Sequence, residues 1–302
     1  IKTILKNISF CKKDILEFNP DKIIFIDYPG FNMRIAKWSK KYKFETIYYI
    51  APQLWAWNEK RINEIKKYIN SLYVILPFEK EFFESKHNYP VKFLGHPLAD
   101  SIYNFKTNYN SSNKFITADK KPIIAILPGS RKQEIKKILN TVIETVECFK
   151  EYQFIVAGAP NIELSYYTSI IKNKKIKVIE NKTYELLSVS YAAIVTSGTA
   201  TLETALFKVP QVVCYKSSYF SFIIAKLIVN IKYISLVNLI MDQEIVKELI
   251  QQDCNKNKIT KELKKILDLN HRKSLKVKYD ELASILGNFG TSKRVALDII
   301  TK

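Results

Sequence analysis

The stretch from Ala192 to Leu206, AAIVTSGTATLETAL, combines residue types that can bind an anion and a sugar. Its apolar start, Ala192–Val195, predicts a buried strand, and the small polar residues Thr196–Thr199 predict a turn that leads directly into a helix. Free backbone N–H groups and the helix dipole favour an anion at such a helix start. Glu203, one turn into the helix, could accept hydrogen bonds from two neighbouring ribose hydroxyls. These features suit the diphosphate and ribose of a nucleotide-sugar donor, and they also suit a capped helix that carries an exposed glutamate.

A second strand–turn–helix junction follows the apolar run Ile123–Leu127, which ends in the turn Pro128–Arg131. Gly129 lets the backbone approach a ligand closely, and Arg131 stands where a guanidinium could clamp a diphosphate with two hydrogen bonds. The alternative is a helix cap with a surface arginine. Because parallel strands open at the same edge of a sheet, the two junctions together favour one anion site. A diphosphate leaving group needs such stabilisation, since losing one preorganised donor typically costs about 3 kcal/mol of barrier.

Three further places carry residues with chemical potential. Asp27 follows the apolar run Ile23–Ile26, where it could accept a proton from an attacking sugar hydroxyl, although a turn before Pro-Gly also accounts for it. Trp55 and Trp57 follow another expected strand, and such a pair more often packs than stacks on a ligand. His96 could contact a phosphate or act as a base, and it could equally be a structural hydrogen-bonding group. The sequence contains neither a P-loop nor a GxGxxG motif, which argues against a P-loop enzyme or a dehydrogenase.

These residues need strands and helices to position them, and apolar runs with strand character alternate with helical patterns along the chain. This order predicts parallel, doubly wound α/β sheets. The expected strands are Ile23–Ile26, Thr46–Ile50, Leu72–Leu76, Val91–Leu94, Ile123–Leu127, Phe154–Val156, Lys177–Ile179, Ala192–Val195 and Gln211–Cys214. The expected helices include Ile4–Leu16, Phe31–Lys41, Lys60–Asn70, Gln133–Glu151, Thr183–Ser190, Thr199–Phe207 and Thr291–Thr301.

The chain of 302 residues is long enough for two domains. The tract Thr107–Lys121 is polar and lacks periodicity, so it is the best candidate for a linker. We therefore expect an N-terminal domain at 1–106, a linker at 107–120, a second domain at 121–285 and a C-terminal helix within 286–302. Ligands would bind at the carboxyl ends of the strands.

The net charge of +19 comes almost entirely from lysines, which are spread along the chain. Nucleic-acid binders usually favour clustered arginines, so a general lysine bias accounts for the charge better, and only a weak attraction to anionic membrane surfaces follows. The most apolar region, Tyr219–Met241, is cut by Lys226 and Lys232, and no run approaches the roughly 20 residues that a membrane span needs. The cysteines lie far apart and predict reduced thiols without a metal site. They are Cys11, Cys148, Cys214 and Cys254.

A series of motifs, in order and covering nearly the whole chain, resembles the lipid-A-disaccharide synthase family. The motifs are IDYPGFN (Ile26–Asn32), APQLWAW (Ala51–Trp57), LPFEKEFF (Leu76–Phe83), FLGHPLAD (Phe93–Asp100), LPGSRKQEI (Leu127–Ile135), TSGTATLETAL (Thr196–Leu206) and VNLIMD (Val237–Asp242). The resemblance implies a GT-B fold, in which two Rossmann-like domains face each other across a cleft. It also implies inverting glycosyl transfer without a metal or another cofactor. UDP-2,3-diacylglucosamine would be the donor and 2,3-diacylglucosamine 1-phosphate the acceptor, and the products would be the β-1,6 disaccharide 1-phosphate and UDP.

The resemblance also assigns roles to matching residues. Asp27 becomes the candidate base or acceptor-orienting group, Arg131 a diphosphate contact that supports the leaving group, and Asn238 a further catalytic polar group near the donor. The donor-binding residues implied are Gly129, Ser130, Ser197, Gly198, Thr199 and Glu203. The residues that match the family without a firm role are Trp55, Trp57 and His96.

The chain departs from the family at its start. Family members begin with a strand and a GExSGD turn, followed by an apolar membrane-associating segment, whereas this sequence opens at Ile1 within an expected helix. We therefore expect an incomplete N-terminal domain with an unpaired sheet edge. The resemblance implies a cytoplasmic protein, peripheral on the inner face of the inner membrane, and leaves the oligomeric state open.

Two other functions remain as alternatives. A UDP-sugar epimerase of similar fold would need additional carboxylates at the cleft. A basic nucleic-acid-binding protein is suggested only by the net charge, and it predicts salt-sensitive binding to DNA or RNA without UDP binding.

Overall fold

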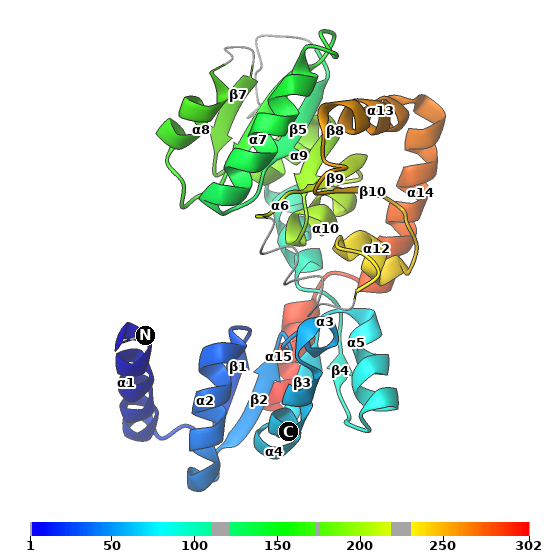
Figure 1. Cartoon of the computed structure of the whole chain (residues 1–302). Coiled ribbons are helices and arrows are strands. Elements are labelled where there is room, and N and C mark those ends of the chain that lie inside the picture. Colours follow the sequence, from blue (N-terminus) through cyan, green and yellow to red (C-terminus); the bar gives the residue numbers. More distant parts are fainter. Residues whose placement is uncertain (1, 110–120, 173–175, 219–230, 302) are drawn as a thin grey trace. The chain divides into compact units, whose positions relative to one another are not determined.

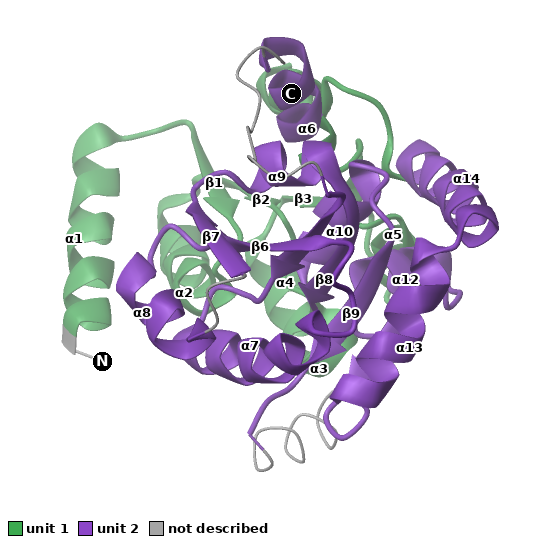
Figure 2. Cartoon of the chain, turned by 90° about the horizontal axis from the view of Figure 1, so that it is seen from above, with its two compact units in different colours: residues 1–99, 228–230, 286–302 green, residues 100–227, 231–285 purple. Residues whose placement is uncertain are grey.

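The computed structural model describes residues 2–109, 121–172, 176–218 and 231–301 (Figure 1). The chain divides into two compact units, each built on its own parallel sheet (Figure 2). Among the described residues, unit 1 holds 2–99 and 286–301, and unit 2 holds 100–109, 121–172, 176–218 and 231–285. The prediction of an α/β protein with two parallel-sheet domains is confirmed.

Unit 1 contains a four-stranded parallel sheet in the order β1-β2-β3-β4. The strands are β1 (Lys22–Ile26), β2 (Glu45–Tyr49), β3 (Ser71–Val74) and β4 (Lys92–Phe93). The α-helices are α1 (Lys2–Phe18), α2 (Pro29–Ser39), α3 (Leu54–Trp57), α4 (Ile62–Tyr68), α5 (Pro77–Glu81) and α15 (Thr291–Ile300). Shorter helical turns are η1 (Lys40–Tyr42), η2 (Glu59–Arg61) and η3 (Phe82–Lys86).

The edge strand β1 of unit 1 is covered on one face. Ile23 and Phe25 are buried in the core that includes residues of α1, α2 and α4, whereas Ile24 and Ile26, on the opposite face, are exposed. This alternation is expected because successive strand residues point to opposite faces. Within the part of the chain that the structure describes, β1 pairs only with β2, so its outer edge is open as the sequence predicted.

Unit 2 contains a six-stranded parallel sheet in the order β10-β9-β8-β5-β6-β7. The strands are β5 (Ile123–Leu127), β6 (Gln153–Gly158), β7 (Ile176–Glu180), β8 (Ser190–Thr196), β9 (Gln211–Tyr215) and β10 (Lys247–Ile250). The helices are α6 (Leu98–Asn108), α7 (Lys132–Val146), α8 (Leu164–Ile171), α9 (Thr183–Val189), α10 (Thr199–Leu206), α12 (Leu236–Met241), α13 (Lys256–Leu267) and α14 (Leu269–Leu286).

The strand order of unit 2 reverses beside β5. The chain continues from β5 to β6 and β7 on one side, and then crosses over to place β8, β9 and β10 on the other. Every residue of β5 is buried, as expected for a central parallel strand with helices on both faces. A reversal of this kind separates the loops that follow the two neighbouring strands, and the resulting crevice is the usual ligand site of an open α/β sheet.

The expected second domain, 121–285, ends where unit 2 ends, but unit 2 begins earlier, at Asp100. Phe105 of α6 packs against Tyr184 and Phe207, with ring centroids 5.5 and 5.7 Å apart, which anchors α6 in unit 2. The C-terminal helix α15 belongs to unit 1, where Val295 and Ile299 cover the face of β2 and β3 opposite to α2 and α4. Long-range packing therefore decides where each unit begins and ends.

Two expected segments fall partly outside the described residues. Of the expected linker, 110–120 is not described, and Thr107 and Asn108 end α6. Of the apolar region Tyr219–Met241, the part 219–230 is not described, and its last residues form α12. No helix in the described ranges is both long and apolar enough to cross a membrane.

Candidate functional site

A cavity of about 580 Å³ opens at the carboxyl ends of β5, β6 and β8 in unit 2. Three segments form most of its wall: Pro128–Arg131 after β5, Ala157–Pro160 at the end of β6, and Thr196–Ala200 from the end of β8 into α10. The cavity therefore lies at the point where the strand order reverses. All six residues predicted to bind the donor line it, together with Arg131. They are Gly129, Ser130, Ser197, Gly198, Thr199 and Glu203.

The two turns that were singled out in the sequence depend on glycine for their backbone. Gly129 has a φ of 105° and Gly198 a φ of 118°, a region that residues with a side chain rarely adopt. A Cβ on Gly129 would also lie 3.0 Å from Glu134 Oε2 and 3.2 Å from the Thr196 methyl group. Gly198 is the N-cap of α10, and its carbonyl accepts a hydrogen bond from the Thr201 hydroxyl at 2.8 Å. The first turn of α10 is thus fixed with its N-terminus at the cavity.

Arg131 is the cation of this cavity. It is the N-cap residue of α7, and its side chain is 82% exposed. Its Nη1 lies 3.2 Å from Oε1 of Glu134, which also lines the cavity. Among the described residues of the lining, Arg131 alone carries a permanent positive charge. The sequence did not single out Glu134, although this acid stands three residues after Arg131, a spacing that brings side chains together on a helix.

Glu203 is held by an aromatic cluster that the sequence did not predict. The Tyr184 hydroxyl donates a hydrogen bond to Glu203 Oε1 at 2.9 Å, and the Tyr184 ring packs on Phe207 with centroids 5.2 Å apart. Burial raises the pKa of Glu203, and the hydrogen bond from Tyr184 lowers it less. Burial and the nearby Glu203 raise the pKa of Tyr184, which keeps its hydroxyl a donor. Glu203 is therefore a carboxyl group of fixed orientation at the wall of the cavity.

Asn238 takes a different place. Its side chain is fully buried, and it is not one of the described residues that line the cavity. Its Oδ1 accepts hydrogen bonds from the backbone N–H groups of Ile245 and Val246, and its Nδ2 donates to the Val246 carbonyl and to Glu248. Both donors and both acceptor positions are used within the protein. The role of Asn238 in the reaction stays a prediction, and the structure shows it engaged in packing.

Asp27 lies at the carboxyl end of β1 in unit 1, as the sequence predicted. Its side chain is exposed, and the backbone at Asp27 and Tyr28 is left-handed, with φ values of 46° and 45°. The Asp27 carbonyl accepts hydrogen bonds from the Tyr48 hydroxyl and from Asn32 Nδ2, both at 2.6 Å. These two bonds hold the turn, so the carboxylate is presented to solvent from a fixed backbone.

Trp55 and Trp57 lie in α3, after β2. The Trp55 indole donates a hydrogen bond to Glu79 Oε1 at 3.1 Å and meets Phe78 edge-on, with centroids 4.9 Å apart. Burial raises the pKa of Glu79 to about 7, against the hydrogen bonds that its carboxylate accepts from two backbone N–H groups and the indole. Trp57 is exposed, with the Arg61 guanidinium 5.4 Å from its ring centroid.

His96 is only 4% exposed. Its Nδ1 accepts a hydrogen bond from the Leu98 N–H at 3.1 Å, and burial lowers its pKa to about 4. The ring is therefore neutral near pH 7 and supports the turn that precedes α6. It offers no positive charge to a phosphate.

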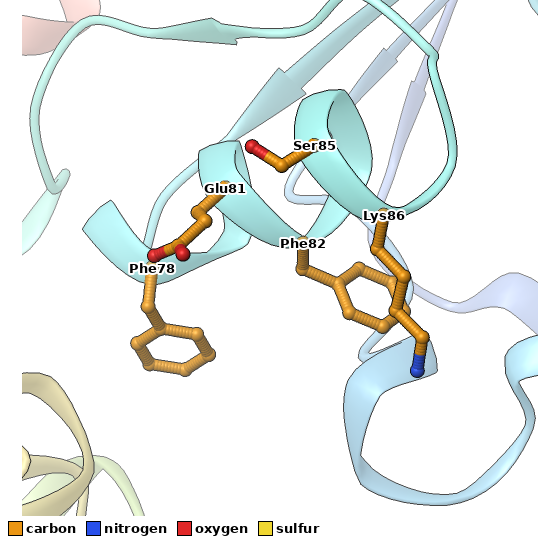
Figure 3. Close-up of a pocket in the computed structure, with 5 residues that line it drawn as sticks. All are labelled: Phe78, Glu81, Phe82, Ser85 and Lys86. Carbon is orange, nitrogen blue, oxygen red and sulfur yellow. The ribbon is translucent and has the colours of Figure 1, made fainter.

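A second hollow, of about 410 Å³, lies on the surface of α5 and η3 in unit 1 (Figure 3). The rings of Phe78 and Phe82 point to the same side of the helix, and the Lys86 side chain runs beside the Phe82 ring. Lys86 is already paired with Glu59 at 2.8 Å. The exposed Glu81 and Ser85 complete its lining, and none of the residues predicted to bind the donor lies in it.

Two parallel-sheet α/β units, with a polar cavity at the strand reversal of one of them, define a protein of the GT-B class. Solved structures agree with this fold. The S. aureus MnaA–UDP co-structure matches with a TM-score of 0.72 and 15% identity, over 100% of this chain and 82% of that chain. The UDP-GlcNAc 2-epimerase of Neisseria meningitidis, bound to UDP-GlcNAc, matches with a TM-score of 0.68 and 14% identity, over 99% and 81%. At these identities the likeness concerns the fold alone.

The sequence comparisons show the family. The model of the lipid-A-disaccharide synthetase family matches residues 1–297. The lipid-A-disaccharide synthase of Coxiella burnetii (strain Dugway 5J108-111) is 36% identical over 282 residues, which are 92% of this chain and 74% of the relative. The chain belongs to the lipid-A-disaccharide synthetase family, which confirms the resemblance found in its motifs and makes it a glycosyltransferase of lipid A biosynthesis.

Proposed function

We propose that this protein transfers a 2,3-diacylglucosaminyl group from UDP to the 6-hydroxyl of 2,3-diacylglucosamine 1-phosphate. The products are the β-1,6-linked lipid A disaccharide 1-phosphate and UDP. The chain belongs to this family, and the observation that carries the proposal is the cavity of unit 2. Two glycine-dependent turns, one exposed arginine and one oriented carboxyl group come together there. Its volume of about 580 Å³ lies within the usual range for small-molecule sites.

The donor binds through its UDP moiety in this proposal. Its diphosphate lies against the turns at Gly129 and at Ser197–Thr199, where backbone N–H groups and the start of α10 favour negative charge. Its ribose hydroxyls donate to Glu203, whose other contact is the Tyr184 hydroxyl. Arg131 exchanges part of its pairing with Glu134 for the diphosphate, with which a guanidinium can form two parallel hydrogen bonds.

Transfer is a single displacement at the anomeric carbon, with inversion. The oxygen of the acceptor 6-hydroxyl forms the new bond as its proton passes to the Asp27 carboxylate. The bond between the anomeric carbon and the β-phosphate oxygen breaks, and its electron pair leaves with UDP. Arg131 stabilises the negative charge that develops on UDP. Such an interaction accelerates the reaction because it is stronger in the transition state than in the bound substrate.

The net charge of +19 supports a further part of the proposal, namely that the protein works at an anionic membrane surface, on the inner face of the inner membrane, where its acylated substrates reside. Sedimentation with vesicles tests it. We expect binding to vesicles that contain anionic phospholipid, weaker binding at high salt, and little binding to vesicles of neutral phospholipid alone. Equal binding to both vesicles would contradict the electrostatic contribution.

The decisive experiment is incubation of the chain with UDP-2,3-diacylglucosamine and the monosaccharide 1-phosphate. We expect equal amounts of disaccharide and UDP, and we expect calorimetry to detect UDP binding. Release of a free sugar from the UDP-sugar without disaccharide would instead indicate epimerase-type chemistry. Salt-sensitive binding to nucleic acid without UDP binding would contradict the proposal altogether.

A further inference from the structure

Glu248 on β10 accepts four hydrogen bonds from one short segment of unit 2. Its Oε2 accepts from the backbone N–H of Ile234 at 2.9 Å. Its Oε1 accepts from the Ser235 N–H at 2.9 Å, from the Ser235 hydroxyl at 2.8 Å and from Asn238 Nδ2 at 2.9 Å. A carboxylate offers about four acceptor positions, so most of the hydrogen-bonding capacity of Glu248 is used within this segment.

Asn238 extends this network in the other direction. Its Oδ1 accepts from the N–H groups of Ile245 and Val246 at 2.8 and 2.9 Å, on the segment that leads into β10. Its own N–H donates to the Ser235 hydroxyl oxygen at 3.3 Å, which caps α12. Glu248 and Asn238 together therefore fasten the start of α12 to β10 and to the residues before it.

The helix α12 lies against α10, the helix whose first residues line the donor cavity together with Glu203 (Figure 1). The strand that carries Glu248 pairs with β9, which pairs with β8, the strand that leads into the Ser197–Thr199 turn. The network is thus connected to one wall of the cavity both through helix packing and through the sheet.

We propose that Glu248 is a positioning residue for donor binding, acting through Asn238 to hold α12 against α10 and so to fix the Ser197–Thr199 turn and Glu203. The VNLIMD motif, which forms α12, then supports the donor site through the packing of α12 against α10. The role in donor binding rests on the proposed function, whereas the mechanical connection between the network and α10 does not.

Replacing Glu248 by glutamine tests the network with almost no change of shape. The glutamine amide can be oriented in two ways. In one, its NH₂ group faces the Ile234 N–H, and in the other it faces the donors of Ser235 and Asn238. At least one hydrogen bond is lost, and two donors are brought together. The matched control is Glu244→Gln, which removes the same charge from an exposed residue whose carboxylate pairs with Lys247 at 2.9 Å.

Hydrogen exchange and UDP binding are measured for the Glu248→Gln, Asn238→Ala, doubly substituted and Glu244→Gln proteins. We expect the first two variants to speed amide exchange in α12 and in the first turn of α10. We also expect each to raise the Kd for UDP roughly tenfold, a factor that corresponds to about 1.4 kcal/mol. For Glu248→Gln, kcat at saturating donor should stay nearly unchanged. The double variant should be little worse than either single one, because both act through the same contact. Glu244→Gln should leave exchange and binding unchanged.

Several results would overturn the proposal. Faster amide exchange confined to α12, with exchange in α10 and the Kd for UDP unchanged, would mean that the network stabilises only α12. A loss of kcat with Asn238→Ala but not with Glu248→Gln would mean that Asn238 contacts the substrates directly. If Glu248→Gln does not fold, Ser235→Ala carries the same test, because it removes one of the four hydrogen bonds to Glu248 and the cap of α12 while the other three bonds to Glu248 stay in place. If the wild-type chain does not bind UDP, the proposed function fails, and exchange in α10 still decides whether the network controls that helix.

Discussion

The strand ends of unit 2 and those of unit 1 both carry polar residues, but they use them differently. After β5 and β8, small residues leave a cavity whose wall is backbone, the exposed Arg131 and the oriented Glu203. After β2 and β4, two polar side chains predicted for the site are already engaged, since Trp55 is hydrogen-bonded to Glu79 and His96 to the Leu98 N–H. Polar groups that can still form hydrogen bonds mark a ligand site, whereas buried groups whose hydrogen bonds are already formed support the backbone. After β1, by contrast, the side chain of Asp27 is exposed.

The largest effect should come from the cation of the cavity. Arg131→Ala should lower kcat by about two to three orders of magnitude, the usual result of removing one preorganised charge-stabilising group. The melting temperature should stay nearly unchanged because the side chain is 82% exposed. Lys136→Ala, which removes an exposed cation of the same helix outside the cavity lining, is the control. Equal turnover in the two variants would remove Arg131 from the reaction.

Two glycines test whether the turn after β8 differs from the turn after β1. Gly198→Ala should destabilise the protein by about 1–3 kcal/mol, because its φ of 118° strains any side chain even though no atom lies within 4 Å of the added Cβ. Gly30, in the first turn of α2, is equally open but has no such φ, so Gly30→Ala should change stability by about 1 kcal/mol or less. Chemical denaturation measures both. Similar costs would show that the conformation of the Ser197–Thr199 turn is not special.

A smaller effect is expected at the carboxyl group of the cavity. Glu203→Gln should weaken UDP binding roughly tenfold, or by about 1.4 kcal/mol, because it loses an acceptor for the ribose hydroxyls. Tyr184→Phe should weaken it less, since only the orienting hydrogen bond at 2.9 Å is removed. Calorimetry with UDP compares the two. An unchanged Kd for Glu203→Gln would return this residue to a structural role.

The effect expected to be smallest on UDP binding is a pH dependence of stability that belongs to unit 1. Burial raises the pKa of Glu79 from 4.5 to about 7, so between these values the folded protein holds a proton that the unfolded chain releases. The free energy of unfolding should therefore fall as pH rises through this window, by at most about 1.4 kcal/mol per pH unit from this group. Glu79→Gln should remove that contribution while leaving UDP affinity unchanged. If UDP affinity followed the same titration, Glu79 would act on the site as well as on the fold.

Much of the fold could be predicted because its signals are local. Each expected strand is present, with ends that shift by a few residues, and the alternation with helices correctly indicated parallel sheets. β10 was missed because Lys247 and Glu248 interrupt its apolar pattern. The cavity-lining residues were found because a glycine turn between a strand and a helix leaves backbone N–H groups open to an anion, and the structure gathers these turns around one cavity.

What local patterns could not predict depends on contacts between distant segments. The sequence by itself determined the strands, the helices, the glycine turns and the family. Only the tertiary structure decided that β8 pairs with β5, which brings the two turns to one reversal point, and that Tyr184 orients Glu203. It also decided that His96 is buried and neutral and that Glu248 engages Asn238. Residue type limits what a side chain can do, but burial and long-range partners determine which of its groups remain available for a ligand.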